Sequence, residues 1–408
     1  MFYKKKVSSS MKRINFNSWQ QYQAIYVHIP FCKQKCLYCD FASYACFGEQ
    51  EMRAYTEALC HEIEVREEEA SKVAAGATVY FGGGTPSVLP TDCLERIVST
   101  LKSCGFWQKP AEATIEVNPG TADVNKLKRL REAGFDRISF GVQSLQDKEL
   151  RAIGRIHNAE EALIAIDMAR AAGFARISCD LIYGLPGQSL ASLADTIQRL
   201  LATGIEHISV YGLIVEEGTP LERLVSAGKL TLPDEDAAAD MYELVQQVLK
   251  AHGFERYEIS NYAKNGQYSR HNTVYWQYHP YIAFGAAACG MEKALRRTAA
   301  STVPEYIAAA QALTSANWRT SELYTSESLT IQQQLEEFMF MGLRRAAGAD
   351  LAEARARFGV DVWQRYGLQL EPIIKKGLAR YDGDKQRLWL TPKGMEIGNQ
   401  IFAIFVDA

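Results

Sequence analysis

The sequence predicts an α/β fold, in which a parallel β-sheet with crossover helices is followed by a smaller α+β unit. Short β-branched runs and helical patterns alternate six times between residues 24 and 252, as they do in parallel sheets. Runs such as "RISCDLIYG" (176–184) are apolar on both faces, so the sheet is either covered by helices on both sides or closed into a barrel. Several helical patterns stop at a glycine, which is a frequent residue at helix C-termini.

The individual elements follow from these patterns in order. The expected strands are 24–29, 77–81, 113–117, 137–142, 176–184 and 207–213. The expected helices are 49–73, 91–104, 122–133, 158–172, 189–203 and 236–252. Glycines that mark helix ends are Gly134, Gly173, Gly204 and Gly253.

The chain divides into four parts, of which residues 23–253 hold the alternating elements. Residues 1–22 form a basic leader that begins "MFYKKKVSSSMKR", and no apolar segment of a secretory signal follows it. We expect a flexible extension there, with a membrane-surface or organelle-targeting role as the alternative. Residues 254–324 are irregular and aromatic, and we expect them to connect the units and to pack over the sheet.

Residues 325–408 predict a final unit of helices followed by a β-hairpin that turns at Asp382-Gly383, a pattern that resembles a winged helix. Nucleic-acid binding needs a basic recognition face. The segment "DLAEARARFGVDVWQRYGLQLEP" mixes acids and bases, so we interpret this unit as a structural or lid element.

Composition limits the classes of function. The net charge of the 408 residues is only -3, from 45 basic and 48 acidic residues, so the bulk charge predicts no nucleic-acid partner. No apolar run reaches the roughly 18 residues of a membrane-spanning helix, so we expect no integral membrane span. Nine cysteines without a secretory signal favour a reducing compartment, the cytoplasm, in which clustered thiols more often bind metal than pair.

The stretch "YVHIPFCKQKCLYCDF" places Cys32, Cys36 and Cys39 on one loop directly after the first expected strand. Cysteine thiolates are the usual ligands of iron–sulfur clusters. Three thiolates can each bind one iron of a 4Fe-4S cluster and leave the fourth iron open for chemistry. A zinc site completed by His28 is the alternative, but structural zinc sites usually have two separated Cys pairs, and the chain has no second pair.

With the aromatic Tyr38 before its last cysteine, this motif resembles the signature of the radical S-adenosylmethionine (SAM) superfamily. The resemblance implies a partial (β/α)6 barrel, in which the amino and carboxylate groups of SAM bind the fourth iron. An electron from the cluster then cleaves SAM to methionine and a 5'-deoxyadenosyl radical. Because the loops after the strands build the site of a βα barrel, the order of further motifs along the strands tests the resemblance.

The resemblance also implies SAM contacts in motifs that follow successive strands: "FGGGTP", "EVNPG", "GVQS" with the later "GRIH", and "CDLIYGLPGQ". The implied contacts are Gly83, Gly84 and Thr85 for the methionyl amino group, Arg155 for the carboxylate, and Glu116, Gln143 and Asp180, with Tyr26 and Tyr38 flanking the cofactor. Taken singly, the glycine run is only a turn and each polar residue only a strand end or a surface charge. A buried carboxylate such as Glu116 nevertheless needs a partner.

Within the superfamily, the chain resembles the oxygen-independent coproporphyrinogen III oxidase family, and in it the HemW-type heme chaperone branch. The oxidases carry a fourth cysteine two residues after the third, where this chain has Phe41. The chaperone branch carries His-Asn-x-x-Tyr-Trp, and this chain has "HNTVYW" from His271 to Trp276. The resemblance implies that His271 binds heme, for which imidazole is a good axial ligand. An ordinary buried histidine is the alternative.

The string "AFGAAACGM" departs from the branch, because Cys289 stands where the family usually has a histidine. A thiolate can also bind heme iron, so Cys289 is either a substitute ligand or a small buried thiol.

These features leave several hypotheses for the function. The first is a heme-binding and heme-transfer protein with a radical-SAM cluster, whose partners are heme, SAM, an unknown heme-acceptor protein and a reductant such as flavodoxin or ferredoxin. The second is a coproporphyrinogen III oxidase, which decarboxylates its substrate oxidatively to protoporphyrinogen IX. A related radical SAM methyltransferase or heme-opening enzyme, and a winged-helix redox regulator, are further alternatives. Phe41 and "HNTVYW" favour the first hypothesis.

Overall fold

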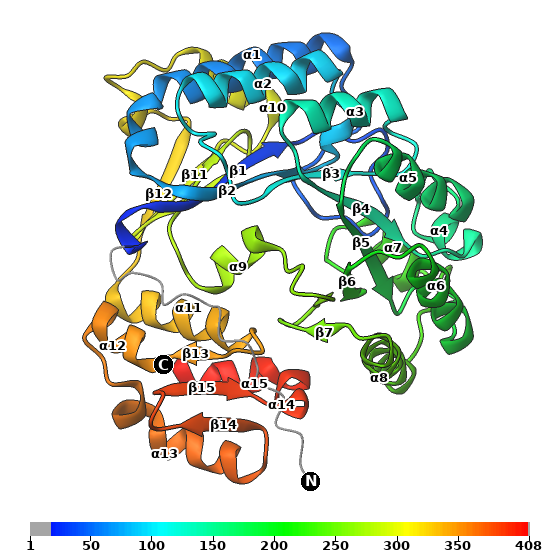
Figure 1. The fold of residues 1–408 in the computed structure, drawn as a ribbon, viewed down its shortest axis with the longest axis vertical. Coiled ribbons are helices and arrows are strands. Elements are labelled where there is room, and N and C mark those ends of the chain that lie inside the picture. Colours follow the sequence, from blue (N-terminus) through cyan, green and yellow to red (C-terminus); the bar gives the residue numbers. More distant parts are fainter. Residues whose placement is uncertain (1–17, 407–408) are drawn as a thin grey trace.

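The computed structural model describes residues 18–406, and its centre is one 12-stranded sheet (Figure 1). The strand order is β12-β11-β10-β9-β1-β2-β3-β4-β5-β6-β8-β7. Six parallel strands follow in sequence order: β1 (Tyr22–Ile29), β2 (Val73–Gly83), β3 (Ala113–Val117), β4 (Arg137–Gln143), β5 (Arg176–Tyr183) and β6 (His207–Gly212). Because β1 pairs with β9 and β6 pairs with β8, these strands form an open, partial barrel, which confirms the predicted fold class.

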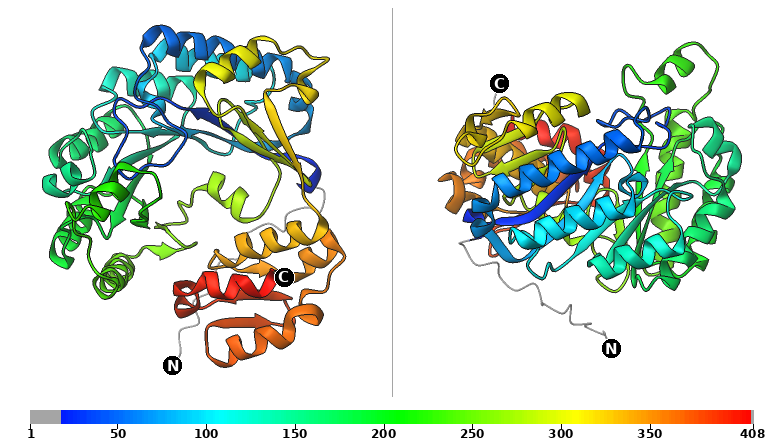
Figure 2. Two further views of the ribbon diagram at one scale, coloured as in Figure 1. Left: turned by 180° about the vertical axis from the view of Figure 1, so that it is seen from behind. Right: turned by 90° about the horizontal axis from the view of Figure 1, so that it is seen from above.

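Long helices lie on the outer side of the parallel strands and carry the chain from one strand to the next (Figure 2). They are α1 (Glu49–Val65), α2 (Thr91–Ser103), α3 (Val124–Ala133), α5 (Ala159–Ala171), α6 (Leu190–Ala202) and α8 (Glu235–Ala251). Two short helices, α4 (Asp147–Ala152) and α7 (Pro220–Ser226), were not predicted. The helix predicted for 49–73 ends at Val65. There the Arg66 guanidinium turns inward to buried Glu62 and Glu69, and a 3-10 helix (Glu67–Lys72) follows.

The two faces of the parallel strands differ in polarity, as the alternation of strand side chains requires. Residues such as Ile115, Phe140 and Leu181 are fully buried in the main hydrophobic core with the outer helices. Residues between them on the same strands, such as Glu116 and Asp180, belong to the opposite, concave face. Polar groups of the barrel therefore gather inside its curve.

Residues 254–324 do not simply pack over the sheet, as the sequence suggested, but extend it at both edges. Their elements are β7 (Glu255–Arg256), β8 (Asn261–Ala263), α9 (Arg270–Trp276), β9 (Tyr281–Phe284), β10 (Cys289–Glu292), β11 (Leu295–Ala299) and α10 (Val303–Gln311), followed by β12 (Tyr324–Ser328). These strands have two to five residues, which is too short for a clear alternating pattern. Helix α9 lies between the concave face and the C-terminal unit and contacts β1, β2 and α11 (Figure 1).

The C-terminal unit has its own core and its own three-stranded antiparallel sheet, of order β13-β15-β14. Its elements are α11 (Ile331–Leu343), β13 (Ala349–Asp350), α12 (Leu351–Phe358), α13 (Val362–Lys375), β14 (Ala379–Asp382), β15 (Arg387–Leu390), α14 (Pro392–Glu396) and α15 (Gly398–Phe402). The predicted hairpin is confirmed: Asp382 Oδ1 accepts hydrogen bonds from the amides of Asp384 and Lys385 in its turn. This arrangement is winged-helix-like.

The basic leader predicted for residues 1–22 lies largely outside the described residues, which begin at Ser18. Within residues 18–406, none of the helices is long and apolar enough to cross a membrane.

Candidate functional site

The three cysteines of the motif lie on the loop that leaves the carboxyl end of β1. Backbone hydrogen bonds fix this loop: the Cys32 amide donates to the Tyr44 carbonyl at 2.9 Å, and the Leu37 amide donates to the Ile153 carbonyl at 3.0 Å. Cys32, Cys36 and Cys39 are all unpaired and partly exposed. The loop therefore presents three thiols next to the carboxyl ends of the parallel strands, where βα barrels place their sites.

Each of the three sulfurs has its own polar neighbour. The Thr85 hydroxyl donates to Cys32 Sγ at 3.6 Å, Arg155 Nη1 donates to Cys36 Sγ at 3.3 Å, and Ser43 Oγ lies 3.9 Å from Cys39 Sγ. Burial raises the pKa of Cys32 and of Cys39. Hydrogen-bond donors and a nearby guanidinium stabilise thiolates, which are the form that binds iron.

The donor set, three thiols on one loop, fits a 4Fe-4S cluster. Among residues 18–406, no three His, Cys, Asp or Glu side chains converge as ligands of one ion. The alternative zinc ligand His28 is engaged elsewhere, with Nδ1 at 3.0 Å from the Tyr26 hydroxyl and Nε2 at 3.0 Å from the Ala42 carbonyl. A 4Fe-4S cluster needs no such convergence, because each thiolate binds a different iron.

The glycine run at the end of β2 packs against the start of the cysteine loop. The amides of Gly84 and Thr85 donate to the carbonyls of Ile29 and Phe31 at 2.8 and 2.7 Å. At Gly83, where φ is 109°, a Cβ atom would lie 2.5 Å from the His28 ring. The two amides are thus already bonded to the cysteine loop, and the run holds that loop in place.

Arg155, in the loop after α4, joins the cysteine loop to β3. Its Nη2 donates to Asn118 Oδ1 at 2.8 Å and to the Gly141 carbonyl, while Asn118 Nδ2 donates to Thr85 Oγ1 at 2.8 Å. Arg155 Nε is buried and has no hydrogen-bond partner among the described residues. A buried donor without a partner is rare in proteins, and a carboxylate such as that of SAM suits this position. Sequence reasoning missed Asn118, although it follows a buried strand end in "EVNPG".

Two carboxyl groups lie further inside the concave face. Burial raises the pKa of Glu116 to about 7, although the Tyr80 hydroxyl donates to its Oε1 at 2.5 Å. Burial also raises the pKa of Asp180, whose carboxylate accepts from Ser139 Oγ at 3.3 Å. These oxygens can accept hydrogen bonds from hydroxyl or ammonium groups of a bound molecule.

The remaining residues predicted to contact SAM lie around these groups. Gln143 is buried at the end of β4 with a φ of 67°, at an irregularity of the β4–β5 pairing. Tyr38 packs against the small buried cluster of Ile153, Ile182 and Leu185. Burial is the main cause that raises the pKa of its phenol, and nearby Cys36 adds to the rise. The Tyr26 ring lies 6.3 Å from that of Tyr80. Arg155 and Thr85 thus contact cysteine sulfurs directly. Tyr26 and Glu116 lie further inside the concave face, beside Tyr80.

His271 is not part of this group. It lies on α9 with 1% of its surface exposed, its Nδ1 is 2.8 Å from the Thr78 hydroxyl, and its Nε2 is 2.8 Å from the Tyr275 hydroxyl. Its ring also stacks on Tyr80, with 4.8 Å between centroids. In this conformation His271 holds α9 to β2, and binding to heme iron remains a prediction that requires α9 to open. Cys289 lies on β10, opposite Thr298 of β11.

Comparison with known families agrees with this geometry. Residues 26–200 match the family model of the radical SAM superfamily, and residues 329–397 match that of the HemN C-terminal domain. The solved structure of coproporphyrinogen III oxidase (HemN) from Escherichia coli covers 96% of this chain and 92% of its own, with a TM-score of 0.79. Its sequence identity is only 21%, so this likeness shows the fold.

Curated relatives match over nearly the whole chain. Heme chaperone HemW of Lactococcus lactis is 35% identical over 95% of this chain and 98% of its own, and HemW of Bacillus subtilis is 36% identical over 94% and 99%. The mitochondrial radical S-adenosyl methionine domain-containing protein 1 of Danio rerio is 36% identical over 80% of this chain and 73% of its own. Identity of this level over this length shows that the chain belongs to the radical SAM superfamily and, within it, to the family of the heme chaperone HemW.

Proposed function

We propose that this protein is a heme chaperone, which carries a 4Fe-4S cluster of the radical SAM type, binds heme and passes it to an acceptor protein. The observation that carries the proposal is the similarity to proteins named heme chaperone over 95% of this chain. Phe41 supports it. At the position where the oxidases carry a further cysteine, this side chain is 66% exposed to solvent and brings no ligand to the cysteine loop.

Membership of the radical SAM superfamily implies a 4Fe-4S cluster and SAM, and the residues present fit both. Cys32, Cys36 and Cys39 would hold the cluster, and Arg155 Nε would hold the SAM carboxylate. When bound, the cluster supplies an electron that can cleave SAM. The protein's own contribution is positional: Arg155 keeps Cys36 hydrogen-bonded and, through Asn118, ties the loop to the end of β3.

A reductant such as flavodoxin or ferredoxin is the proposed electron donor. Lys33 and Lys35 are exposed on the cysteine loop, beside a single exposed acid, Asp40. Exposed cations next to a redox centre favour encounter with acidic electron-transfer proteins. The nine unpaired cysteines support a reducing compartment, and we infer the cytoplasm.

Oxidative decarboxylation of coproporphyrinogen III is the second candidate. The chain has the complete set of predicted SAM contacts on the strand ends. A protein that only carries heme would not need them, so they favour this enzymatic candidate. SAM binding in a chaperone would instead control heme transfer.

One experiment separates the two candidates. The protein is reconstituted anaerobically and given SAM and a reductant, together with either coproporphyrinogen III or heme. We expect stoichiometric heme binding, seen by its Soret band, and no decarboxylated tetrapyrrole by mass spectrometry. Protoporphyrinogen IX as a product would overturn the chaperone proposal and establish the oxidase.

A further inference from the structure

Arg344, at the C-terminal end of α11, is a half-buried cation without an acceptor. Its Nε is buried, and its side chain forms no hydrogen bond or ion pair within residues 18–406. Burial lowers the pKa of this guanidinium. A guanidinium carries five N–H donors, and buried donors without partners are exceptions that need an explanation. A ligand with acceptor atoms would supply the missing partner.

The two aromatic rings beside Arg344 do not fill this role. The central carbon of its guanidinium lies 5.7 Å from the centre of the Trp276 ring on α9 and 5.6 Å from that of the Phe402 ring on α15. Aromatic rings attract a cation, but they offer none of the oxygen atoms that a guanidinium fork binds. The charge therefore lies between α9 and the C-terminal unit with its N–H groups available to a ligand.

Glu258, in the loop between β7 and β8, is an acid whose charge acts on Arg344, but no ion pair joins the two. Its Oε2 accepts a hydrogen bond from the Ser260 amide at 3.3 Å, and its side chain also bonds that of Asn261. Burial raises the pKa of Glu258, which favours its neutral form. Arg344 thus lacks a counterion in the described part of the chain.

Trp276 gives a second, independent observation. Its indole Nε1 is buried and has no hydrogen-bond partner among the described residues. Buried indole N–H groups usually find a partner. Because the Trp276 ring lies beside the Arg344 guanidinium, two kinds of donor without an acceptor meet where α9 contacts α11. One anionic group can accept from both.

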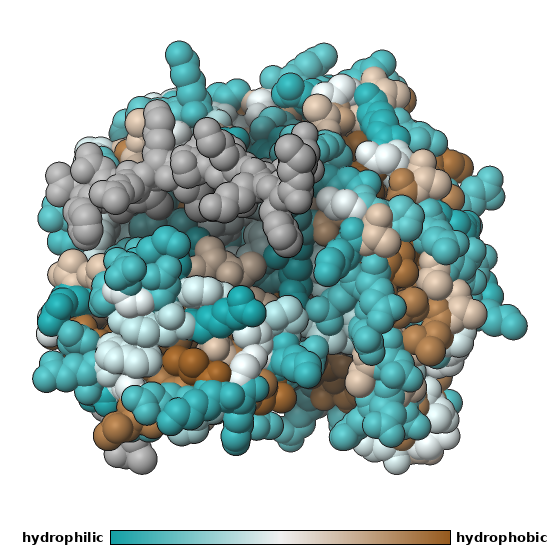
Figure 3. All heavy atoms as spheres, turned by 60° about the horizontal axis from the view of Figure 1, so that its bottom comes forward, coloured by the Kyte–Doolittle hydropathy of each residue, from teal (hydrophilic) through white to brown (hydrophobic). Residues whose placement is uncertain are grey.

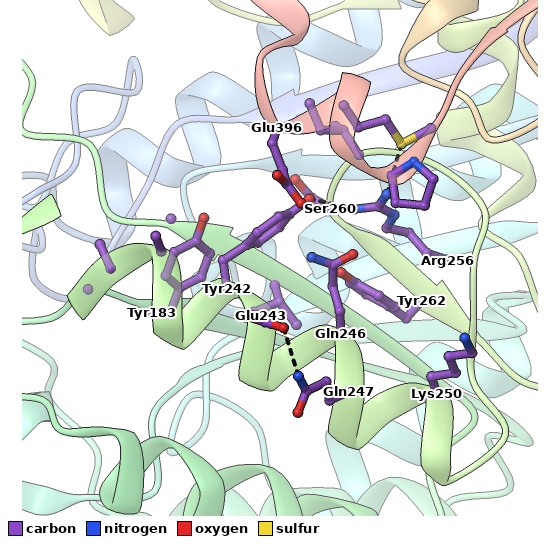
Figure 4. Close-up of a pocket in the computed structure, with 18 of the residues that line it drawn as sticks. Tyr183, Tyr242, Glu243, Gln246, Gln247, Lys250, Arg256, Ser260, Tyr262 and Glu396 are labelled. Carbon is purple, nitrogen blue, oxygen red and sulfur yellow. Dashed lines mark hydrogen bonds between the residues drawn. The ribbon is translucent and has the colours of Figure 1, made fainter. Parts of the chain in front are cut away.

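A pocket of about 1400 Å³ between α8 and the C-terminal unit offers a contrast (Figure 4). Its cation Arg256 donates to the Tyr242 hydroxyl and also bonds that of Tyr262. Acids outnumber cations in this lining, which disfavours an anion there; the acids are Asp240, Glu243, Glu255 and Glu396. Among the residues coloured in Figure 3, the apolar ones form separate groups on a mostly hydrophilic face. Neither Arg344 nor Trp276 lines the pocket.

The donors at Arg344 narrow the class of ligand. A planar guanidinium matches a carboxylate, which accepts two parallel N–H bonds. The SAM carboxylate already has a place at Arg155 Nε in the proposed function. Heme brings two propionate carboxylates and a flat apolar ring, which suits the rings of Trp276 and Phe402. Trp276 also lies on the same helix as His271, the predicted heme ligand. A heme propionate is therefore the carboxylate to expect at Arg344.

We propose that Arg344 binds a propionate of the heme that this protein carries, with Trp276 Nε1 as a second donor to that carboxylate. The inference rests on the proposed function and adds a residue that selects the ligand by its carboxylates. The propionate stays ionised and the iron keeps its oxidation state, so this step transfers neither a proton nor an electron. Since Arg344 belongs to the C-terminal unit and His271 to α9, a heme bound by both would hold the two together.

Titration of the full-length protein with ferric heme and with its dimethyl ester tests this role. The ester keeps the iron and the ring but has no carboxylate. By the Soret band, in the same detergent, we expect the wild type to bind heme roughly 10-fold more tightly than the ester, because hydrogen bonds between charged groups are strong. Arg344→Gln should bind both alike. Arg380→Gln, at an exposed position of β14, removes the same charge and should keep the wild-type preference.

Two further variants keep the test decisive if Arg344→Gln is unstable. Arg344→Lys keeps the charge but loses the fork, and Trp276→Phe keeps an aromatic ring but loses the N–H, so each should reduce the preference for heme. The ratio of the two affinities is taken within each variant, so a general loss of affinity cancels.

The outcomes separate this inference from the proposed function. If the wild type binds heme and its ester equally, or if folded Arg344→Gln or Arg344→Lys keeps the wild-type preference, the assignment of Arg344 is wrong and the chaperone proposal stands. An unchanged preference in Trp276→Phe would remove Trp276 alone from the site. If the wild type binds no heme, the chaperone proposal itself fails.

Discussion

Arg155 Nη2 lies 2.8 Å from Asn118 Oδ1, while Nη1 of the same guanidinium lies 3.3 Å from Cys36 Sγ. One side chain therefore links the cysteine loop after β1 to the end of β3. Its Nε remains free for a carboxylate.

Replacing this guanidinium should separate SAM binding from cluster binding. Arg155→Lys keeps a positive charge near Cys36 but loses the fork that reaches Asn118 and a carboxylate together. We expect the cluster to form and SAM affinity to fall roughly 10- to 100-fold, measured by the change that SAM causes in the EPR spectrum of the reduced cluster. Arg151→Lys, at an exposed position of α4, is the control. Unchanged SAM affinity in Arg155→Lys would contradict this role.

The cysteines of the loop should differ from the other thiols in cluster content. Cys36→Ala removes one ligand, so we expect little iron or sulfide to be retained after anaerobic reconstitution. Cys46→Ala changes an exposed cysteine with no role in the motif and should retain the wild-type amount. Equal iron and sulfide in the two variants would remove the assignment.

Crowding at the glycine run can be measured apart from backbone strain. Gly83 and Gly120 both have positive φ, 109° and 79°, but an added Cβ meets the His28 ring only at Gly83 and nothing within 4 Å at Gly120. Each alanine variant carries the strain of this backbone region, which costs about 1–3 kcal/mol. We expect Gly83→Ala to lower the Tm further than Gly120→Ala does, by thermal denaturation. Equal shifts would show that the His28 contact relaxes freely.

The stability of the protein should fall in mild acid. Burial lowers the pKa of His271 from 6.5 to about 3, with Glu112 opposing the shift and Arg137 adding to it. The unfolded chain therefore binds a proton at higher pH than the folded one, so this contribution is complete above about pH 6.5 and is lost as the pH falls towards 3.

Urea unfolding at several pH values measures this effect. Between about pH 4 and pH 6 we expect the free energy of unfolding of His271→Gln to fall less steeply than that of the wild type, by roughly 1.4 kcal/mol per pH unit. His207 is also buried with a lowered pKa, so it contributes to the wild-type slope as well, and His271→Gln should remove only part of that slope. An identical slope in His271→Gln would show that His271 binds its proton at the same pH in the folded and unfolded states, which would contradict the lowered pKa.

The sequence could predict the barrel and which side chains meet at the cysteine loop, because both follow from the order of the motifs along the strands; the role of these side chains in binding a cluster or SAM stays a prediction. Motifs after successive strands come together when the strands are parallel, and Arg155 and Thr85 do meet the cysteine loop. Asn118 was missed because its role depends on two neighbours that are far away in the sequence. The pocket between α8 and the C-terminal unit could not be foreseen either, since residues as far apart as Tyr183 and Glu396 line it. The burial of His271 follows from the position of α9, which no local pattern specifies.

The short length of helix α9 affects how often His271 becomes accessible. Seven residues are too few for a helix to persist in water by itself, so its order depends on Glu112, which accepts the amides of Arg270 and His271, and on packing against β2 and α11. The local opening of α9 can therefore be followed by hydrogen exchange. The rate at which its amide hydrogens exchange with deuterium, measured on the protein without heme, reports how often α9 opens and His271 leaves its buried position.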